Sequence, residues 1–164
     1  MKKSLIFICT IMVCFLLVGC GSKDTKKEDN KKDNVANVSG SLSDIMEKLY
    51  EGIPEEEMPS LADLVTLDKD TFVNFAFVDN VKYKEAVVSE PVIGAIAHSV
   101  VLIRLEDAKD ASKVVEDIKK NANPRKWVCV EAEHTYVLSK GDLVVLIMSN
   151  EHADKIKENF ENLK

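Results

Sequence analysis

The sequence predicts an α+β domain built on an antiparallel four-stranded sheet with helices on one face. Apolar residues recur at helical spacing in some segments, while β-branched residues cluster in others. These segments follow one another as a helix, an uncertain segment and two ββα units. Hairpin strands followed by helices are typical of an antiparallel sheet that helices cover. We therefore expect residues 41–164 to form one domain with a single core.

The first expected helix begins after Ser41. Ser41 and Asp44 have the spacing of a capping box, and apolar residues recur at helical intervals from Leu42 to Leu49. Residues 71–78 are ambiguous, because TFVNFAFV alternates like a strand while the acidic residues before it could cap a short helix. We expect a helix there.

Four strands are expected where β-branched and other apolar residues gather. They are residues 83–89, 94–105, 127–132 and 143–148. Residues 136–138 could form a separate short strand. Two helices complete the pattern, one over residues 111–122 before Pro124 and one after Asn150.

The apolar run VVLI occurs twice, at residues 100–103 and again 44 residues later. In both places a polar turn and a helix follow. Two interpretations remain open: the two ββα units could be structural repeats, or the matches could reflect only that any two buried strands are apolar.

The N-terminus has the layout of a secretory signal. Two lysines precede a 14-residue apolar run at residues 5–18. A membrane-spanning helix needs roughly 20 such residues, so cleavage is favoured over permanent insertion. Residues 17–20, LVGC, resemble the lipobox of bacterial lipoproteins, in which the cysteine sulfur carries a diacylglyceryl group. The alternative is an uncleaved N-terminal anchor.

This layout divides the chain into three parts. Residues 1–19 are expected to be a lipoprotein signal peptide, residues 20–40 a lipidated N-terminus and flexible stalk, and residues 41–164 the folded domain. The stalk is polar and could span roughly 25 Å. Acyl chains on Cys20, such as palmitate, would hold the protein on the extracytoplasmic face of the cell membrane. Cys129 would then remain as a single free thiol, so no internal disulfide is expected.

The folded part is acidic. Residues 41–164 contain 15 basic and 24 acidic side chains, a net charge of about −9. Nucleic acids and other polyanions bind to basic surfaces, so they are excluded as expected partners.

No pattern predicts a catalytic residue, a metal site or a cofactor. His98 and Ser99 are neighbours on a strand and point to opposite faces, so one cannot deprotonate the other. No phosphate-binding loop, nucleophile elbow or metalloprotease motif occurs. The three histidines, His98, His134 and His152, lack metal-ligand spacing.

The run PRKWVCV at residues 124–130 is the most distinctive part of the domain. If it is a strand, Trp127 and Cys129 share one face, just as His98 and Arg104 share a face of their own strand. Trp127, His98 and Arg104 are therefore candidate ligand-binding residues on an uncovered side of the sheet. The alternative is that Trp127 closes the core and Cys129 is a small buried apolar residue.

Three consecutive glutamates at residues 55–57 form a second notable cluster. Adjacent carboxylates do not converge on one point in regular structure. We interpret the cluster as a solvated loop, with a recognition element as the alternative.

Four stretches, EAVVSEP at 85–91, AHSVVLIR at 97–104, PRKWVCV at 124–130 and GDLVVLI at 141–147, resemble a family of unknown function found in lipoproteins of low-GC Gram-positive bacteria. The resemblance implies the same signal, stalk and α/β domain. It brings no activity, ligand or catalytic residue.

Together these features lead us to expect a membrane-anchored, non-catalytic module that binds an envelope protein, a peptide or a small solute. A sheet edge could accept a peptide as an added strand. The alternative is a ligand carrier or enzyme that uses the Trp127 face of the sheet.

Overall fold

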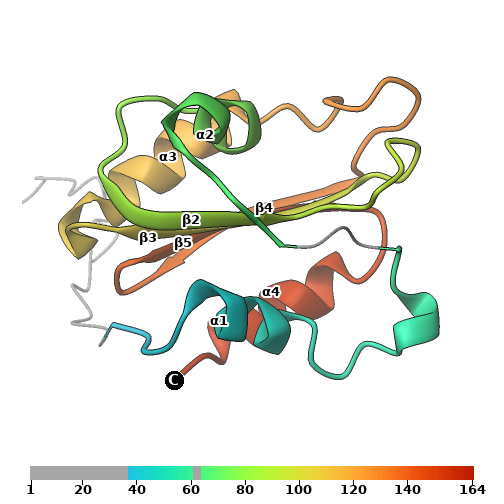
Figure 1. The fold of residues 1–164 in the computed structure, drawn as a ribbon, viewed down its shortest axis with the longest axis horizontal. Coiled ribbons are helices and arrows are strands. Elements are labelled where there is room, and N and C mark those ends of the chain that lie inside the picture. Colours follow the sequence, from blue (N-terminus) through green and yellow to red (C-terminus); the bar gives the residue numbers. More distant parts are fainter. Residues whose placement is uncertain (1–36, 61–63) are drawn as a thin grey trace, which may run out of the picture. The chain divides into compact units, whose positions relative to one another are not determined.

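The computed structural model describes residues 37–60 and 64–164 (Figure 1). These residues form one antiparallel sheet of five strands in the order β1-β2-β3-β5-β4. The strands are β1 Val65–Thr66, β2 Tyr83–Ser89, β3 His98–Leu105, β4 His134–Lys140 and β5 Leu143–Ser149. The predicted α+β class and antiparallel sheet are confirmed, with five strands in place of four.

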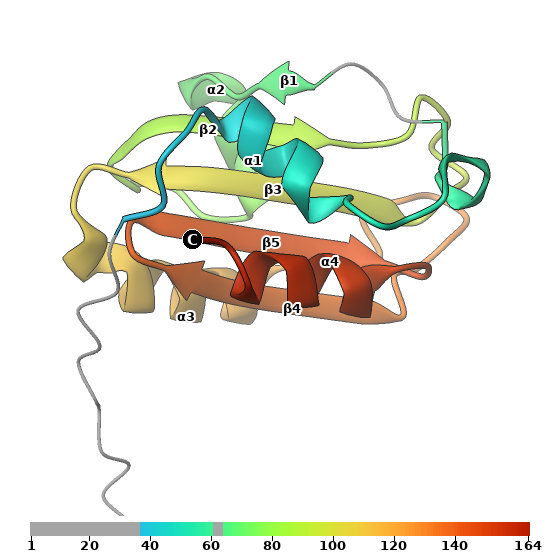
Figure 2. The same cartoon turned by 90° about the horizontal axis from the view of Figure 1, so that it is seen from below.

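The α-helices of the described residues lie on both sides of this sheet. They are α1 Leu42–Leu49, α2 Lys69–Ala76, α3 Ala111–Asn121 and α4 Ala153–Glu161. Helices α2 and α3 cover one face and α1 and α4 the other, as Figures 1 and 2 show from two directions. The prediction that all helices lie on one face is wrong. We refer to the two sides as the α2/α3 layer and the α1/α4 layer.

The central strands explain why both faces are covered. Residues 143–148 of β5, LVVLIM, are fully buried at every position. A strand with one solvent face alternates between apolar and polar residues, whereas a strand buried on both faces is continuously apolar. The sequence therefore contained the signal for a second helical layer.

β3 and β5 pair along their whole length in the middle of the sheet. Val101 lies opposite Leu146, and Leu102 opposite Val145. β3 and β4 run parallel to each other, because each pairs antiparallel with β5, which lies between them. Helix α3 connects these two parallel strands across the α2/α3 layer.

The prediction of a strand at residues 127–132 is wrong, because this segment is a loop. The backbone N–H of Ala132 donates to the carbonyl of Pro124 at 2.9 Å, which closes the loop on itself. The fourth main strand is β4, which begins at His134 and includes the possible short strand at 136–138. As an edge strand β4 keeps exposed polar residues, so its apolar signal is weak.

The expected helices are confirmed. Ser41 and Asp44 form the capping box of α1: the Asp44 N–H donates to Ser41 Oγ at 3.1 Å, and the Ser41 N–H to Asp44 Oδ2 at 3.3 Å. Asp68 caps α2, the segment that was ambiguous, through the N–H groups of Asp70 and Thr71. Helix α4 docks beside α1, where the Asn159 side chain donates to the carbonyls of Leu49, the last residue of α1, and of Glu51.

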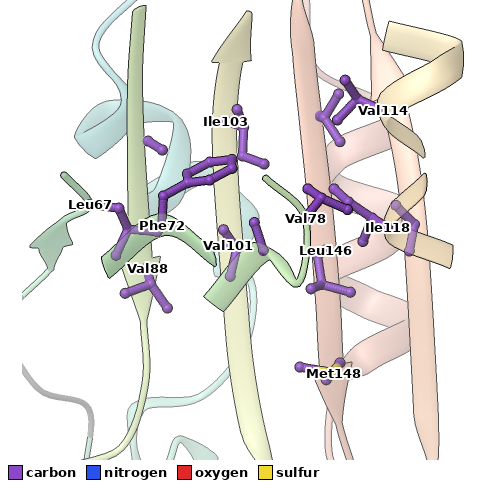
Figure 3. Close-up of a cluster of buried hydrophobic side chains, with 14 of the residues drawn as sticks. Leu67, Phe72, Val78, Val88, Val101, Ile103, Val114, Ile118, Leu146 and Met148 are labelled. Atoms are coloured by element: carbon purple, nitrogen blue, oxygen red, sulfur yellow. The ribbon is translucent and has the colours of Figure 1, made fainter. Parts of the chain in front are cut away.

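The core has one part in each layer. Figure 3 shows the α2/α3 part, where Phe72, Val101, Ile103 and Ile118 meet between the sheet and the helices. The Phe72 ring stacks on the ring of Tyr83, with centroids 4.4 Å apart. Close packing of such side chains sets the position of each helix over the sheet.

The two predicted ββα units are present, as β2-β3-α3 and β4-β5-α4, but they are not structural repeats. Val100 faces the α1/α4 layer, while Val144, its match 44 residues later, faces the α2/α3 layer. Val101 faces the α2/α3 layer, while its match, Val145, faces the α1/α4 layer. Helices α3 and α4 accordingly cover opposite faces, so the matched VVLI runs reflect burial alone.

We expect Ile45→Ala in α1 and Ile118→Ala in α3 each to lower the free energy of unfolding by about 2–5 kcal/mol, because each leaves a cavity in one layer. Both side chains have 0% exposure. Urea denaturation measures the loss. Ile93→Ala, at a side chain that is 59% exposed, is the matched control and should stay within about 0.5 kcal/mol of the wild type. A loss in only one of the two core variants would show that one face is not packed.

Candidate functional site

A cavity of about 750 Å³ opens at the end of the sheet where β3 begins and β5 ends. Its walls come from a 3₁₀ turn, Glu55–Glu57, with the residues that follow it, from the β2–β3 loop, and from the turn between β5 and α4. Val130 of the loop before β4 completes it. In Figures 1 and 2 these segments gather at one end of the molecule.

The floor of the cavity is a buried hydrogen-bond network centred on His98. His98 Nε2 lies 2.9 Å from the hydroxyl of Tyr50, and Nδ1 lies 2.9 Å from Ser149 Oγ. Ser89 Oγ is 3.1 Å from the Tyr50 hydroxyl oxygen. His98, Ser89 and Ser149 are all buried. The network joins α1 to the ends of β2, β3 and β5.

The proton between His98 and Ser149 can be assigned from one contact. The Ser149 hydroxyl donates to the carbonyl of Glu151 at 2.7 Å, which uses its only proton. His98 Nδ1 must then donate to Ser149 Oγ. The Tyr50 hydroxyl donates to Ser89 Oγ and lies within hydrogen-bond distance of His98 Nε2.

Burial keeps these groups neutral. Burial, with a smaller effect from the nearby His152, lowers the pKa of His98 to about 4. Burial also raises the pKa of Tyr50 well above its ordinary value. At neutral pH the floor is thus polar but uncharged.

This arrangement differs from a catalytic triad. A nucleophilic serine must give its proton to the histidine, whereas Ser149 gives its proton to a backbone carbonyl and has 1% exposure. Ser99, the serine next to His98 in sequence, points to the other face of the sheet, as predicted from strand periodicity. We interpret the His98 network as a rigid support for the cavity wall.

The rim of the cavity is acidic. Glu56, Glu57 and Glu151 contribute exposed carboxylates, and the described residues that line the cavity include no lysine or arginine. His152 Nε2 lies 3.4 Å from Glu57 Oε2, which connects two walls of the cavity. His152 also has a left-handed backbone, with φ of 57°, an uncommon conformation for a residue other than glycine. Two of the three consecutive glutamates thus line a cavity, a role that their spacing alone did not reveal.

The structure does not bring Trp127 and His98 together. Trp127 is half-buried and packs against the core of the α2/α3 layer, while His98 lies on the face toward α1 and α4. Cys129 is exposed, so the interpretation as a buried apolar residue is wrong. The sheet also has no uncovered central face, because the two helical layers occupy both sides.

The residue before Trp127 has a specific structural role that sequence reasoning missed. Lys126 Nζ forms a half-buried ion pair with Glu90 and lies 3.3 Å from Ser99 Oγ. It also sits over two aromatic rings, 4.8 Å from the centroid of Phe75 and 5.3 Å from that of Trp127. The distinctive PRKWVCV run therefore attaches its loop to the β2–β3 loop and to α2.

Arg104 lies at the other end of β3 from His98. They are six positions apart along the extended strand, or about 20 Å. The Arg104 guanidinium donates to the carbonyls of Val38 and Gly40, at 2.9 and 2.7 Å. Its other contacts are Glu85 Oε1 at 3.1 Å and Asp142 Oδ1 at 3.4 Å. Arg104 therefore fastens the segment before α1 to the sheet and takes no part in the cavity.

These contacts show that ordered structure begins before Ser41. Val38 is buried in the α1/α4 layer, although it falls in the range predicted for the stalk. The predicted signal peptide and the predicted lipidation site, Cys20, lie outside the described residues. Among the residues described, no group of three or more histidine, cysteine, aspartate or glutamate side chains could hold a metal ion. No helix in the described ranges has the length and apolar character needed to cross a bilayer.

Comparisons of this chain with family models, curated proteins and solved structures found no match. The resemblance to a lipoprotein family of unknown function therefore remains a prediction from the four sequence stretches.

We expect the free energy of unfolding to decrease as the pH falls, and we expect His98 to cause this decrease. Its pKa is about 4 in the folded state and about 6.5 when unfolded. Between these values the unfolded state binds more protons, so the stabilisation is complete above about pH 6.5 and is lost toward pH 4. The wild type should lose about 2 kcal/mol between pH 6.5 and pH 5, as measured by urea denaturation. His98→Gln should remove this slope.

His134→Gln is the matched control, because no hydrogen bond of the network involves His134. That variant should keep the slope of the wild type. An equal slope in His98→Gln would show that His98 is not the group responsible.

Arg104→Lys should lower the free energy of unfolding by about 1–3 kcal/mol, because a single ammonium cannot hold both carbonyls and both carboxylates. Arg125→Lys, at a side chain that is 77% exposed, is the control and should have an effect within about 0.5 kcal/mol. Thermal unfolding compares the two variants. Equal stabilities would rule out the fastening role of Arg104.

Proposed function

We propose that this protein is a lipid-anchored, extracytoplasmic, non-catalytic binding module. The N-terminal layout of signal, LVGC sequence and polar stretch supports the anchor on Cys20, and the acidic domain argues against nucleic acid as a partner. The proposed arrangement is a signal peptide at 1–19, a lipidated stalk at 20–40 and a folded domain that meets its partner outside the cytoplasmic membrane.

One observation carries the binding role: the cavity lies at the end of the domain opposite the point where the chain enters it. Arg104 holds the entering segment at one end of β3, and His98 lies under the cavity at the other end. In both views the first described residues and the C-terminus lie at the end away from the β2–β3 loop (Figures 1 and 2). In a domain anchored through its N-terminus, the cavity would lie at the end away from the tether.

The chemistry of the cavity supports binding over catalysis. Its histidine is neutral and fully hydrogen-bonded, and its serine is buried with its proton committed to a carbonyl. The alternative role for the Trp127 face loses its support, because Trp127 belongs to the core of the α2/α3 layer. The cavity has a volume typical of ligand sites, and its lining mixes apolar side chains such as Met58, Ile96 and Val130 with polar and acidic ones.

The anchor is tested by Cys20→Ala in the full-length protein, expressed in a bacterium that processes lipoproteins. The wild type should enter the membrane fraction as a chain that begins at Cys20 and carries the mass of a diacylglyceryl group. Cys20→Ala should carry no lipid mass, because the acceptor sulfur is gone.

Cys14→Ala changes a cysteine of the signal and leaves LVGC intact, so it should be processed like the wild type. Wild-type protein that still begins at Met1 and has no lipid mass would overturn the proposed anchor.

A further inference from the structure

The cavity combines an acidic rim with apolar walls, and this combination selects a class of ligand. We propose that it binds a basic side chain of an extended peptide segment whose neighbouring apolar residues contact the tip of the β2–β3 loop. This inference rests on the proposed binding function and adds the chemical class of the partner.

The charge of the cavity favours a cation. Three carboxylates, on Glu56, Glu57 and Glu151, face one histidine, His152. Even with His152 protonated, the net charge of the lining is negative, and the floor adds no compensating charge because His98 is neutral. A lysine or arginine side chain would therefore gain attraction from the rim, and its methylene stem could lie along apolar walls.

The apolar part of the surface extends beyond the cavity. Met58, Ile96 and Val130 line it. On the same loop as Ile96, Val92 is 72% exposed and Ile93 is 59% exposed. A single small amine would leave these two side chains in water, whereas a peptide could cover them with residues that flank its basic side chain. The open cavity admits a side chain from a longer segment.

The surface is held in place before any partner arrives. The Val92 N–H donates to the carbonyl of Ser60 at 3.1 Å, and the ion pair of Lys126 with Glu90 holds the base of the same loop. The His152–Glu57 contact connects the opposite walls. A preorganised site loses less conformational entropy on binding than a mobile one.

The same charges disfavour other occupants. A second copy of the chain would bring one acidic rim against another, and a bilayer rich in anionic lipids would repel the rim. The acidic rim therefore favours a basic, partly apolar peptide as its partner.

The experiment uses the full lipidated protein in nanodiscs of neutral phosphatidylcholine. The probe is a rhodamine-labelled peptide with blocked ends and the sequence Ala-Leu-Lys-Leu-Ala, followed by fluorescence anisotropy. We expect saturable binding that weakens as salt rises. A peptide with glutamine in place of the lysine should bind at least about tenfold more weakly. Absence of binding at about 5 mM protein sites, with the lipid anchor intact, would overturn the ligand class while leaving the proposed anchor standing.

Two variants locate the site. Glu56→Gln/Glu57→Gln/Glu151→Gln should reduce affinity for the lysine peptide about tenfold or more, because it removes the rim charge and keeps the side-chain shape. Glu47→Gln/Glu106→Gln/Glu116→Gln removes the same number of charges from other exposed positions and should bind like the wild type. The proposal would be overturned if the two triple variants bound the lysine peptide with equal affinity, whether both matched the wild type or both bound more weakly.

Two further measurements separate a peptide from a small amine. Val92→Ser/Ile93→Ser should weaken binding of the lysine peptide severalfold, because the loop tip loses apolar contact. Free cadaverine should compete only weakly. Competition by cadaverine at the concentration of the peptide itself, with no effect of the loop variant, would show that the cavity is a small-amine site and overturn the peptide proposal.

Discussion

The pairing of β3 with β5 is the interaction on which the rest of the structure depends. Both strands are apolar on both faces, so the pair can be stable in water only if material covers it from two sides. α1 and α4 supply one cover and α2 and α3 the other. The flanking strands β2 and β4 widen the surface on which these helices pack, while the polar side chains of β3 and β5 lie near the ends of these two strands.

The ends of the β3–β5 pair have different chemistry. At one end Arg104, Asp142 and Glu85 form a charged group that engages the backbone of the entering chain. At the other end His98 and Ser149 lie directly opposite each other in the register, and they form an uncharged network with Tyr50. A charge that is paired and partly exposed suits a structural fastening, whereas a neutral buried network can support a cavity without filling it with counter-charges.

Much of the fold was predictable because it follows from local periodicity. The capping box at Ser41 fixed the start of α1, and strand alternation correctly placed His98 and Ser99 on opposite faces. The strand expected around Trp127 failed because alternation shows that a segment is amphipathic and cannot show that a partner strand lies beside it. The prediction of helices on only one face failed because it used the apolar runs of β3 and β5 only as evidence for strands. Their continuous apolar character also indicates burial on both faces.

The site was less predictable because its contacts span the chain. Tyr50 and His98 are 48 residues apart, and neither carries a motif that identifies the other. Arg104 was predicted to bind a ligand, whereas its partners in the structure include backbone carbonyls, which have no sequence signature. The cavity itself arises where four segments end near one another, and only a tertiary structure shows that.

The fastening of Val38 and Gly40 by Arg104 also sets a limit on what proteolysis can remove. All the contacts described for the folded unit lie at Val38 or beyond. A cut between Cys20 and that residue would leave every contact described here, with the cavity and its acidic rim, on the released part. If the chain is tethered as proposed, a single cleavage would convert a surface-bound receptor into a diffusible one without any loss of its binding chemistry.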